Sequence, residues 1–412
     1  MKHESLPGRR YQSGMSLIEL MIALLIGTIL IVGMVQVFGA SRSAYQLSQG
    51  IARNQESARF ALDFLGRDLR MAGHAGCVND QSLLATDSTG TNVIGGNIRS
   101  LFLDNTQRAG NDVAALPFPL RFDMAIQGFE ANGTAPGSAV TLSTTPTVGT
   151  AAGWSPNLPA ALAGLSPIAG SDIVVLRYLS ADEAPVQWAP GSPTTISYPT
   201  ASSGVATGGN GLFALTDCNA VAVFQTSTTP TTTGMTVSTA GLNKSGFDPV
   251  APHDEVSISN PNATLYRAES IAYYVALNPQ NVPALYRARW TTAPGSDALT
   301  VVAEEMVEGV ESLQLLYGED ANSENLALLP SGHITKTNTA ATIDAGGPGR
   351  WRRVGAVQLG MMVRGGGEER AASMQATAPQ HVLQVAMTAP NDGHYRSVYE
   401  TTLAVRNRLF GN

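Results

Sequence analysis

The chain is short of cysteine and of charged residues in general. Its 412 residues include two cysteines, Cys77 and Cys218, and no CxxC pair, which excludes a zinc ribbon and a thioredoxin-like redox site. Charged residues make up 14% of the chain, against roughly 25% in an average soluble domain. The net charge of −7 argues against a general affinity for nucleic acid. The abundance of Gly, Ser, Thr and Asn indicates an extracytoplasmic protein rich in loops and strands.

The sequence patterns of catalytic and metal sites are missing as well. There is no GxSxG motif, no Walker loop and no HExxH. The Gly-rich stretch 365–370 lacks the Lys-Ser/Thr pair of a phosphate-binding loop, so it predicts a turn. The histidines show no ligand spacing: His3, His74, His253, His333, His381 and His394. We therefore expect no catalytic residue, no metal ion and no cofactor.

One basic cluster is present in this acidic chain. Arg350, Arg352 and Arg353 surround Trp351 in the stretch GRWRR. Arginines beside a stacking ring are a pattern that can hold a nucleic-acid backbone. We expect instead a solvated loop that leads into the next strand, with nucleic-acid contact as the alternative.

A long hydrophobic run occupies the amino-terminal region. From Ser16 to Ser41, a stretch of 26 residues, the only ionisable side chain is Glu19. As a helix this run is about 39 Å long, enough to cross a hydrocarbon core of about 30 Å. Arg9 and Arg10 precede it, so the positive-inside rule leaves the start in the cytoplasm and sends the rest outward.

Three interpretations of this run compete. A cleaved secretory signal fits poorly, because the run is too long, contains a carboxylate and is not followed by an A-x-A site. A plain signal anchor accounts for the length and leaves the carboxylate unexplained. The third interpretation covers every feature, because the stretch resembles the class III signal of type IV prepilins in its basic leader, its Gly-Met junction and its early glutamate: Arg9-Arg10, Gly14, Met15 and Glu19.

The resemblance implies a processing reaction in which this chain is the substrate. A prepilin peptidase on the cytoplasmic face removes the leader, residues 1–14, by cutting between Gly14 and Met15, and Met15 is then N-methylated. Glycine suits the cut because its backbone can be approached closely. A carboxylate at mid-membrane costs roughly 2.5–3.5 kcal/mol, and the resemblance implies that Glu19 offsets this by pairing with the terminal amine of a neighbouring subunit. A hydrated or protonated Glu19 near the interface is the alternative.

The helix is expected to continue beyond the membrane. Between residues 41 and 72, apolar residues recur at spacings of three, four and seven: Leu47, Ile51, Ala58, Ala61, Leu62, Leu65 and Leu69. On the other face, Asp63 has arginines four residues away on both sides, at Arg59 and Arg67. We therefore predict one helix over 15–73, transmembrane in its first half, softly interrupted at Gly50 and stopped at Gly73.

Residues 74–412 are expected to form a periplasmic β-rich domain. Strand-like runs occur at 172–180, 220–225, 270–277, 284–290, 310–318, 356–365 and 397–410. Stretches rich in Thr, Ser, Gly and Pro lie between them, at about 131–170, 183–212 and 226–262, and predict loop insertions or short extra strands. The predicted fold class is α+β, with the amphipathic half of the helix packed on a mainly antiparallel sheet, which is the architecture of type IV pilins.

Several blocks of this domain resemble a PilW-type minor pilin: GHAGC (73–77), GSDIVVLRY (170–178), TDC (216–218), YYV with NVPALYR (273–287), VEGVESLQLLYGED (307–320) and TTLAVRNR (401–408). The resemblance implies a subunit of the initiation or tip complex of a type IV pilus, which supports twitching motility, adhesion or DNA uptake. It implies an inner-membrane, single-pass protein with a periplasmic carboxy-terminal domain that later enters the extracellular pilus. The alternatives are a pseudopilin of a type II secretion system and, from another class, a membrane-anchored periplasmic enzyme.

The same resemblance implies a set of partners. These are other minor and major pilins, a pilus tip adhesin, the prepilin peptidase, the inner-membrane pilus assembly platform and inner-membrane lipid. Nucleic acid is reached, if at all, through the assembled pilus.

The two cysteines predict one covalent link. In an oxidising periplasm Cys77 and Cys218 can form a disulfide. It would close an interval of about 140 residues and contribute roughly 4–5 kcal/mol in the chain-entropy model. Two buried free thiols are the alternative.

Overall fold

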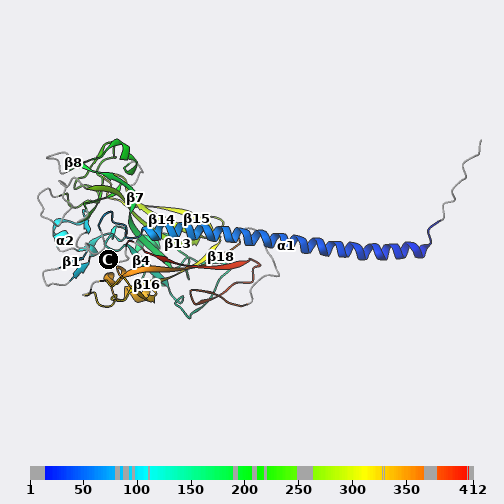
Figure 1. The fold of residues 1–412 in the computed structure, drawn as a ribbon. Coiled ribbons are helices and arrows are strands. Elements are labelled where there is room, and N and C mark those ends of the chain that lie inside the picture. Colours follow the sequence, from blue (N-terminus) through cyan, green and yellow to red (C-terminus); the bar gives the residue numbers. More distant parts are fainter. Residues whose placement is uncertain are drawn as a thin grey trace, which may run out of the picture.

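A long helix projects from a β-rich body in the computed structural model (Figure 1). The structure describes residues 14–407 with the exception of 79–83, 87–91, 95–97, 110–111, 189–193, 207–210, 218–219, 248–262, 327, 329, 366–377 and 406. The expected fold class, a long apolar amino-terminal helix followed by a mainly β-sheet domain, is therefore confirmed.

Helix α1 (Leu17–Met71) has 55 residues and is about 82 Å long. Ser16 caps its amino-terminal end, and the Ser16 hydroxyl accepts the N–H of Ile18 at 3.3 Å. The helix ends two residues before Gly73, whose φ of 76° lies in the left-handed region that favours glycine. The expected interruption at Gly50 is wrong, because α1 is continuous there. Gly50 is buried, and a Cβ on Gly365 would lie 3.5 Å from its carbonyl oxygen, so this glycine permits a close approach instead of a break.

The larger sheet has nine strands. Seven follow the order β3-β11-β10-β13-β7-β4-β6, and β14 and β15 extend from β13. Neighbouring strands are antiparallel except β11 and β3, which are parallel. The strands are β3 (Ile98–Ser100), β4 (Ile126–Ala131), β6 (Trp154–Ser155), β7 (Ile173–Pro185), β10 (Leu212–Thr216), β11 (Val221–Gln225), β13 (Thr264–Leu277), β14 (Pro283–Thr291) and β15 (Thr300–Glu308).

A second sheet of four antiparallel strands has the order β17-β16-β18-β21. Its strands are β16 (Val310–Asp320), β17 (Ile334–Asn338), β18 (Val354–Arg364) and β21 (Arg396–Ala404). The expectation of one sheet is therefore incomplete, since the chain turns at Gly309 between β15 of the first sheet and β16 of the second. Gly309 has a φ of 89°, and a Cβ there would lie 2.6 Å from the carbonyl oxygen of Arg364, so the turn requires glycine.

Short elements complete the body. The small sheets are β1 (Leu84–Thr86) with β2 (Asn92–Ile94), β12 (Gly234–Thr236) with β9 (Thr195–Ser197) and β8 (Gln187–Trp188), and β19 (Gln380–Val382) with β20 (Val385–Thr388) and β5 (Ala139–Thr141). The short helices are α2 (Asn105–Ala109), α3 (Ala160–Ala163), α4 (Ala340–Asp344) and α5 (Pro348–Trp351), with 3-10 turns at Val113–Ala115, Phe118–Leu120, Ala151–Gly153 and Thr200–Val205. The Thr/Ser/Gly/Pro-rich stretches thus contain short strands and helices, although parts of them lie outside the described residues.

The second half of α1 packs against both main sheets. Ala58, Ala61, Leu65 and Leu69 are fully buried on one face of the helix. They share a core with apolar residues of β7, β13 and β14 from the larger sheet and of β16, β18 and β21 from the smaller one. Strands of both sheets flank this half of the helix, whereas its first half extends away from the body (Figure 1). The body therefore holds one half of α1 and leaves the other half to its surroundings.

Candidate functional site

The predicted cleavage site lies at the start of α1. Gly14 and Met15 are exposed and precede the helix, and no described atom lies within 4 Å of where a Cβ on Gly14 would be. The described part of the fold therefore does not shield this peptide bond. Arg9 and Arg10 lie outside the described residues, and the cut itself stays a prediction.

Glu19 lies in the first turn of α1 and is exposed. A carboxylate in a first turn interacts favourably with the positive end of the helix dipole. Among the described residues no lysine, arginine or histidine forms an ion pair with Glu19. The described side chains of this subunit therefore supply no cation to Glu19.

The first half of α1 is apolar and uncovered. Its most apolar 18-residue window has a mean hydropathy of 2.6, and none of that window is buried. Large apolar side chains stand exposed along this half, from Met15 at 64% to Phe38 at 71%. The helix is long and apolar enough to cross a membrane, and both lipid and other apolar helices are chemically suited to cover it.

The second half of α1 carries a buried carboxylate that ties it to the larger sheet. Asp68 is 7% exposed and accepts the hydroxyl protons of Tyr178 at 3.2 Å and Tyr273 at 2.7 Å. Arg287 Nη1 lies 3.6 Å from the same carboxylate. Burial, and then the nearby Asp68 carboxylate, raise the pKa of both tyrosines, so they remain hydrogen-bond donors. Asp68 thus links α1 to β7, β13 and β14.

Two asparagines tie the helix to the smaller sheet and to the segment after it. Asn54, 1% exposed, donates to the carbonyl oxygen of Val363 in β18 at 2.8 Å. Asn407, just beyond β21, donates to the carbonyl oxygens of Arg70, Met71 and Ala72 at 3.1–3.4 Å. Carbonyl groups at a helix end have no partner within the helix, so Asn407 acts as a cap from a distant part of the chain.

The sequence analysis overlooked these three polar anchors. Asn54 and Asp68 lie on the same helix face as Ala58, Ala61 and Leu65. A polar residue inside an apolar stripe is the available signal for such an anchor, because burial without a partner is costly. The predicted surface pair on the opposite face is present between Asp63 and Arg67, at 3.4 Å.

The prediction of a solvated loop at GRWRR is wrong. Arg350 donates to both carboxylate oxygens of Glu319, at 2.9 and 2.6 Å, and the side chain of Trp351 is buried edge-on against Tyr317. Arg352 donates to the backbone carbonyl oxygen of Asp123, and Arg353 donates to the backbone carbonyl oxygen of Leu328. The three guanidinium groups form hydrogen bonds within the fold, so this cluster does not offer a surface for binding nucleic acid.

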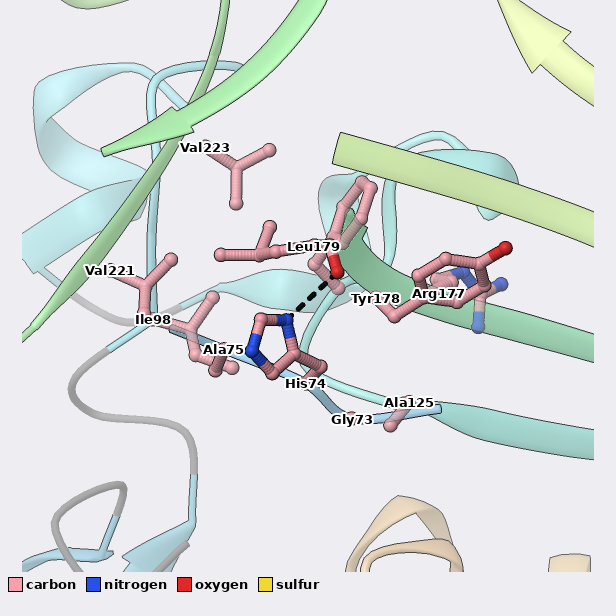
Figure 2. Close-up of a pocket in the computed structure, with 11 residues that line it drawn as sticks. Gly73, His74, Ala75, Ile98, Ala125, Arg177, Tyr178, Leu179, Val221 and Val223 are labelled. Carbon is pink, nitrogen blue, oxygen red and sulfur yellow. Dashed lines mark hydrogen bonds between the residues drawn. The ribbon is translucent and has the colours of Figure 1, made fainter. Parts of the chain in front are cut away.

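A small cavity lies where α1 leads into the larger sheet (Figure 2). His74 Nδ1 donates to the carbonyl oxygen of Leu179 at 2.9 Å across it. Arg177 also lines it and is held by the carbonyl oxygens of Met124 and Phe118. Burial lowers the pKa of Arg177 to about 9. With a volume of about 20 Å³ the cavity has room for one water molecule, so it is a packing feature.

The remaining predictions concern the histidines, the Gly-rich stretch 365–370 and the two cysteines. In the described part of the chain no group of His, Cys, Asp and Glu residues is arranged to hold a metal ion. His3, His253 and most of the stretch 365–370 lie outside the described residues. Cys77 Sγ lies 3.9 Å from the Thr216 hydroxyl. Cys218 itself is outside the described residues, so the disulfide stays a prediction.

Comparison with known proteins gives two family matches. Residues 272–407 match the model of the family described as type IV pilus-assembly protein W, PilW. Residues 9–35 match that of the prokaryotic N-terminal methylation motif. No curated protein matches the chain. A type IV-like pilin from Thermus thermophilus is a similar solved structure, with 15% identity over 35% of this chain and 70% of that chain; its TM-score of 0.20 adds nothing to the fold described above.

The two matches cover the start of α1 and the residues of the body that hold the second half of this helix. The methylation motif spans the Gly14–Met15 junction and Glu19. The PilW match contains Tyr273, Arg287, Val363 and Asn407, which receive or cap the second half of α1. The methylation motif, the PilW match and the helix-and-sheet architecture together support the role of a minor pilin subunit of a type IV pilus for this chain.

Proposed function

We propose that the protein assembles into a type IV pilus through the exposed half of α1, as part of the initiation or tip complex. One observation carries this proposal: a single continuous helix is fixed to the body over its second half and bare and apolar over its first half. Lipid covers the bare half before assembly, and helices of other pilins replace the lipid in the filament. Since helices in lipid associate through close packing and polar contacts, Gly27 and Gly33 suit such an interface.

Processing precedes assembly in this proposal. A prepilin peptidase cuts the exposed bond between Gly14 and Met15, and Met15 is then N-methylated. The resulting amine is a cation at the same end of the helix as Glu19. We propose that Glu19 pairs with the amine of a neighbouring subunit, since no described lysine, arginine or histidine side chain of its own subunit forms an ion pair with it.

The proposed location follows from the same helix. The protein is anchored in the inner membrane by one span, with its body in the periplasm, and later moves to the extracellular pilus. Its proposed partners are other minor and major pilins, the tip adhesin, the prepilin peptidase and the assembly platform. The pilin-type matches point to a structural subunit, and the PilW match favours a pilus over a type II secretion system.

We also propose that Cys77 and Cys218 form a disulfide in the periplasm. The contact of Cys77 with Thr216, two residues before Cys218, supports it. The bridge would join the segment after α1 to the end of β10 and so secure the region where the helix enters the body.

The test uses cells in which the natural chain is replaced by variants. Mass spectrometry of sheared pilus fractions should find this protein with an N-methylated Met15 at its amino terminus. In Glu19→Leu we expect its amount in the filament to fall about tenfold or more, which corresponds to about 1.4 kcal/mol or more of lost pairing. Glu56→Leu, an exposed change farther along α1, is the control and should leave incorporation unchanged.

Equal incorporation of the Glu19→Leu variant and the natural chain would contradict the pairing. Absence of the natural chain from sheared pili, with an intact chain in the membrane, would contradict the proposed function itself.

A further inference from the structure

Strand β15 is a long edge strand with little protection. Within the described part of the chain it pairs with β14 and has no strand on its other side. Residues 300–305 are exposed, including the apolar Val301 and Val302 at 44% and 49%. Proteins usually protect such an edge with a short strand, a proline, charged side chains, a bulge or a covering helix. The first four residues of β15, 300–303, carry no charge and no proline, and the one register shift of the strand lies beyond residue 305.

The charges on β15 indicate what kind of strand it accepts. Glu304 is held by Arg287 at 2.8 Å. Glu305 and Glu308 contact the Asn278 amide at 3.3 and 3.4 Å, and neither forms an ion pair with a described lysine or arginine. Like charges across paired strands are destabilising. A second copy of β15 would bring such carboxylates together, whereas a strand with basic side chains would neutralise them.

The position of β15 indicates where the partner comes from. β15 is in contact with α1 and lies along its second half (Figure 1). In the proposed function the first half of α1 packs among the helices of neighbouring pilins. Packing of these helices brings the bodies of neighbouring subunits next to one another, and the open edge of β15 is then within reach of a neighbour's strand. This step rests on the proposed function.

We propose that the open edge of β15 pairs with a strand of a different pilin-type subunit that carries lysine or arginine beside it. Strand addition of this kind gains main-chain hydrogen bonds, and the flanking side chains provide selectivity. The nine-stranded sheet then continues across the subunit boundary, and Val301 and Val302 lose their exposure to water.

Photo-crosslinking of the full chain in piliated cells tests the pairing. Benzoylphenylalanine replaces Val302 in one strain, Val148 in a second and Leu24 in a third. Val148 is 52% exposed outside β15 and serves as the matched control, and Leu24 reports helix packing. We expect Val302 to give an adduct with another pilin-type subunit, identified by mass spectrometry, and Val148 to give none.

Charge reversal tests the proposed selectivity. Glu305→Lys combined with Glu308→Lys should lower the Val302 adduct about tenfold, because the new lysines repel a basic partner. Asp297→Lys, an exposed reversal outside β15, should not lower it.

The possible outcomes separate the two proposals. If the Leu24 position crosslinks to other pilins but Val302 gives no adduct, or gives one only to another copy of this chain, the strand pairing is refuted and the pilin function stands. If the variant with both Glu305→Lys and Glu308→Lys gives the Val302 adduct at full strength, the proposal that the partner strand is basic is refuted. If neither Leu24 nor Val302 crosslinks to a pilin, the proposed function fails and the pairing fails with it.

Discussion

Replacing Asp68 with asparagine should loosen α1 from the larger sheet. The change keeps the size of the side chain but removes its charge and one of its two acceptor oxygens. The hydroxyl bonds from Tyr178 and Tyr273 each end on a different oxygen of Asp68, and Arg287 loses a charged neighbour. A hydrogen bond to a charged group contributes about 1.5–3 kcal/mol. We therefore expect the variant to lose about 2–4 kcal/mol of unfolding free energy.

The same helix offers a matched control. The side chain of Asp63 is 63% exposed and pairs with Arg67 at 3.4 Å, and exposed i,i+4 pairs contribute only about 0.3–0.5 kcal/mol. Urea unfolding of the full chain in detergent, followed by near-ultraviolet circular dichroism of the buried tyrosines, compares Asp68→Asn with Asp63→Asn. A double-mutant cycle with Tyr273→Phe should give a coupling energy of about 1 kcal/mol or more. The anchoring role of Asp68 is refuted if the two asparagine variants unfold at the same urea concentration.

Two further predictions concern the body. Burial raises the pKa of Glu130, beside Asp172, to about 7 from its ordinary 4.5, so its contribution to stability is complete below about pH 4.5 and is lost as the pH rises through 7. Glu130→Gln should therefore be more stable than the natural chain at pH 8, by up to about 3 kcal/mol, and equal to it near pH 4; equal urea midpoints at pH 8 would contradict this. The proposed Cys77–Cys218 disulfide predicts that reduction raises the intact mass by about 2 Da, and an unchanged mass would exclude the bridge.

The apolar first half of α1 and seven of the strands could be predicted because their signals are local. Composition alone marks residues 16–41, and a motif of a few residues marks Gly14, Met15 and Glu19. Every strand-like run overlaps a strand, from β7 to β21, although the run predicted at 397–410 extends beyond the end of β21 at Ala404. Strand β16 shows only imperfect alternation in its sequence because all eleven of its residues are buried, so neither face is marked by solvent-exposed residues.

The remaining features depend on contacts between distant parts of the chain. The partners of Asn54 and Asp68 lie from 110 to 309 residues away, and no local pattern identifies them. Trp351 and its neighbouring arginines resembled a surface loop because α5 has only four residues and shows no periodicity. The acceptors that bury these arginines, Glu319 and Asp123 among them, belong to separate segments.

The arrangement of the anchors on α1 has a mechanical consequence. The attachments at Asn54, Asp68 and the capped end near Met71 are spread over the second half of one continuous rod. Tension applied to the protruding half acts parallel to the rod, so these bonds and the apolar face between them are sheared together and share the load. Detachment under traction then requires their concerted rupture, whereas a perpendicular pull would peel them apart one at a time.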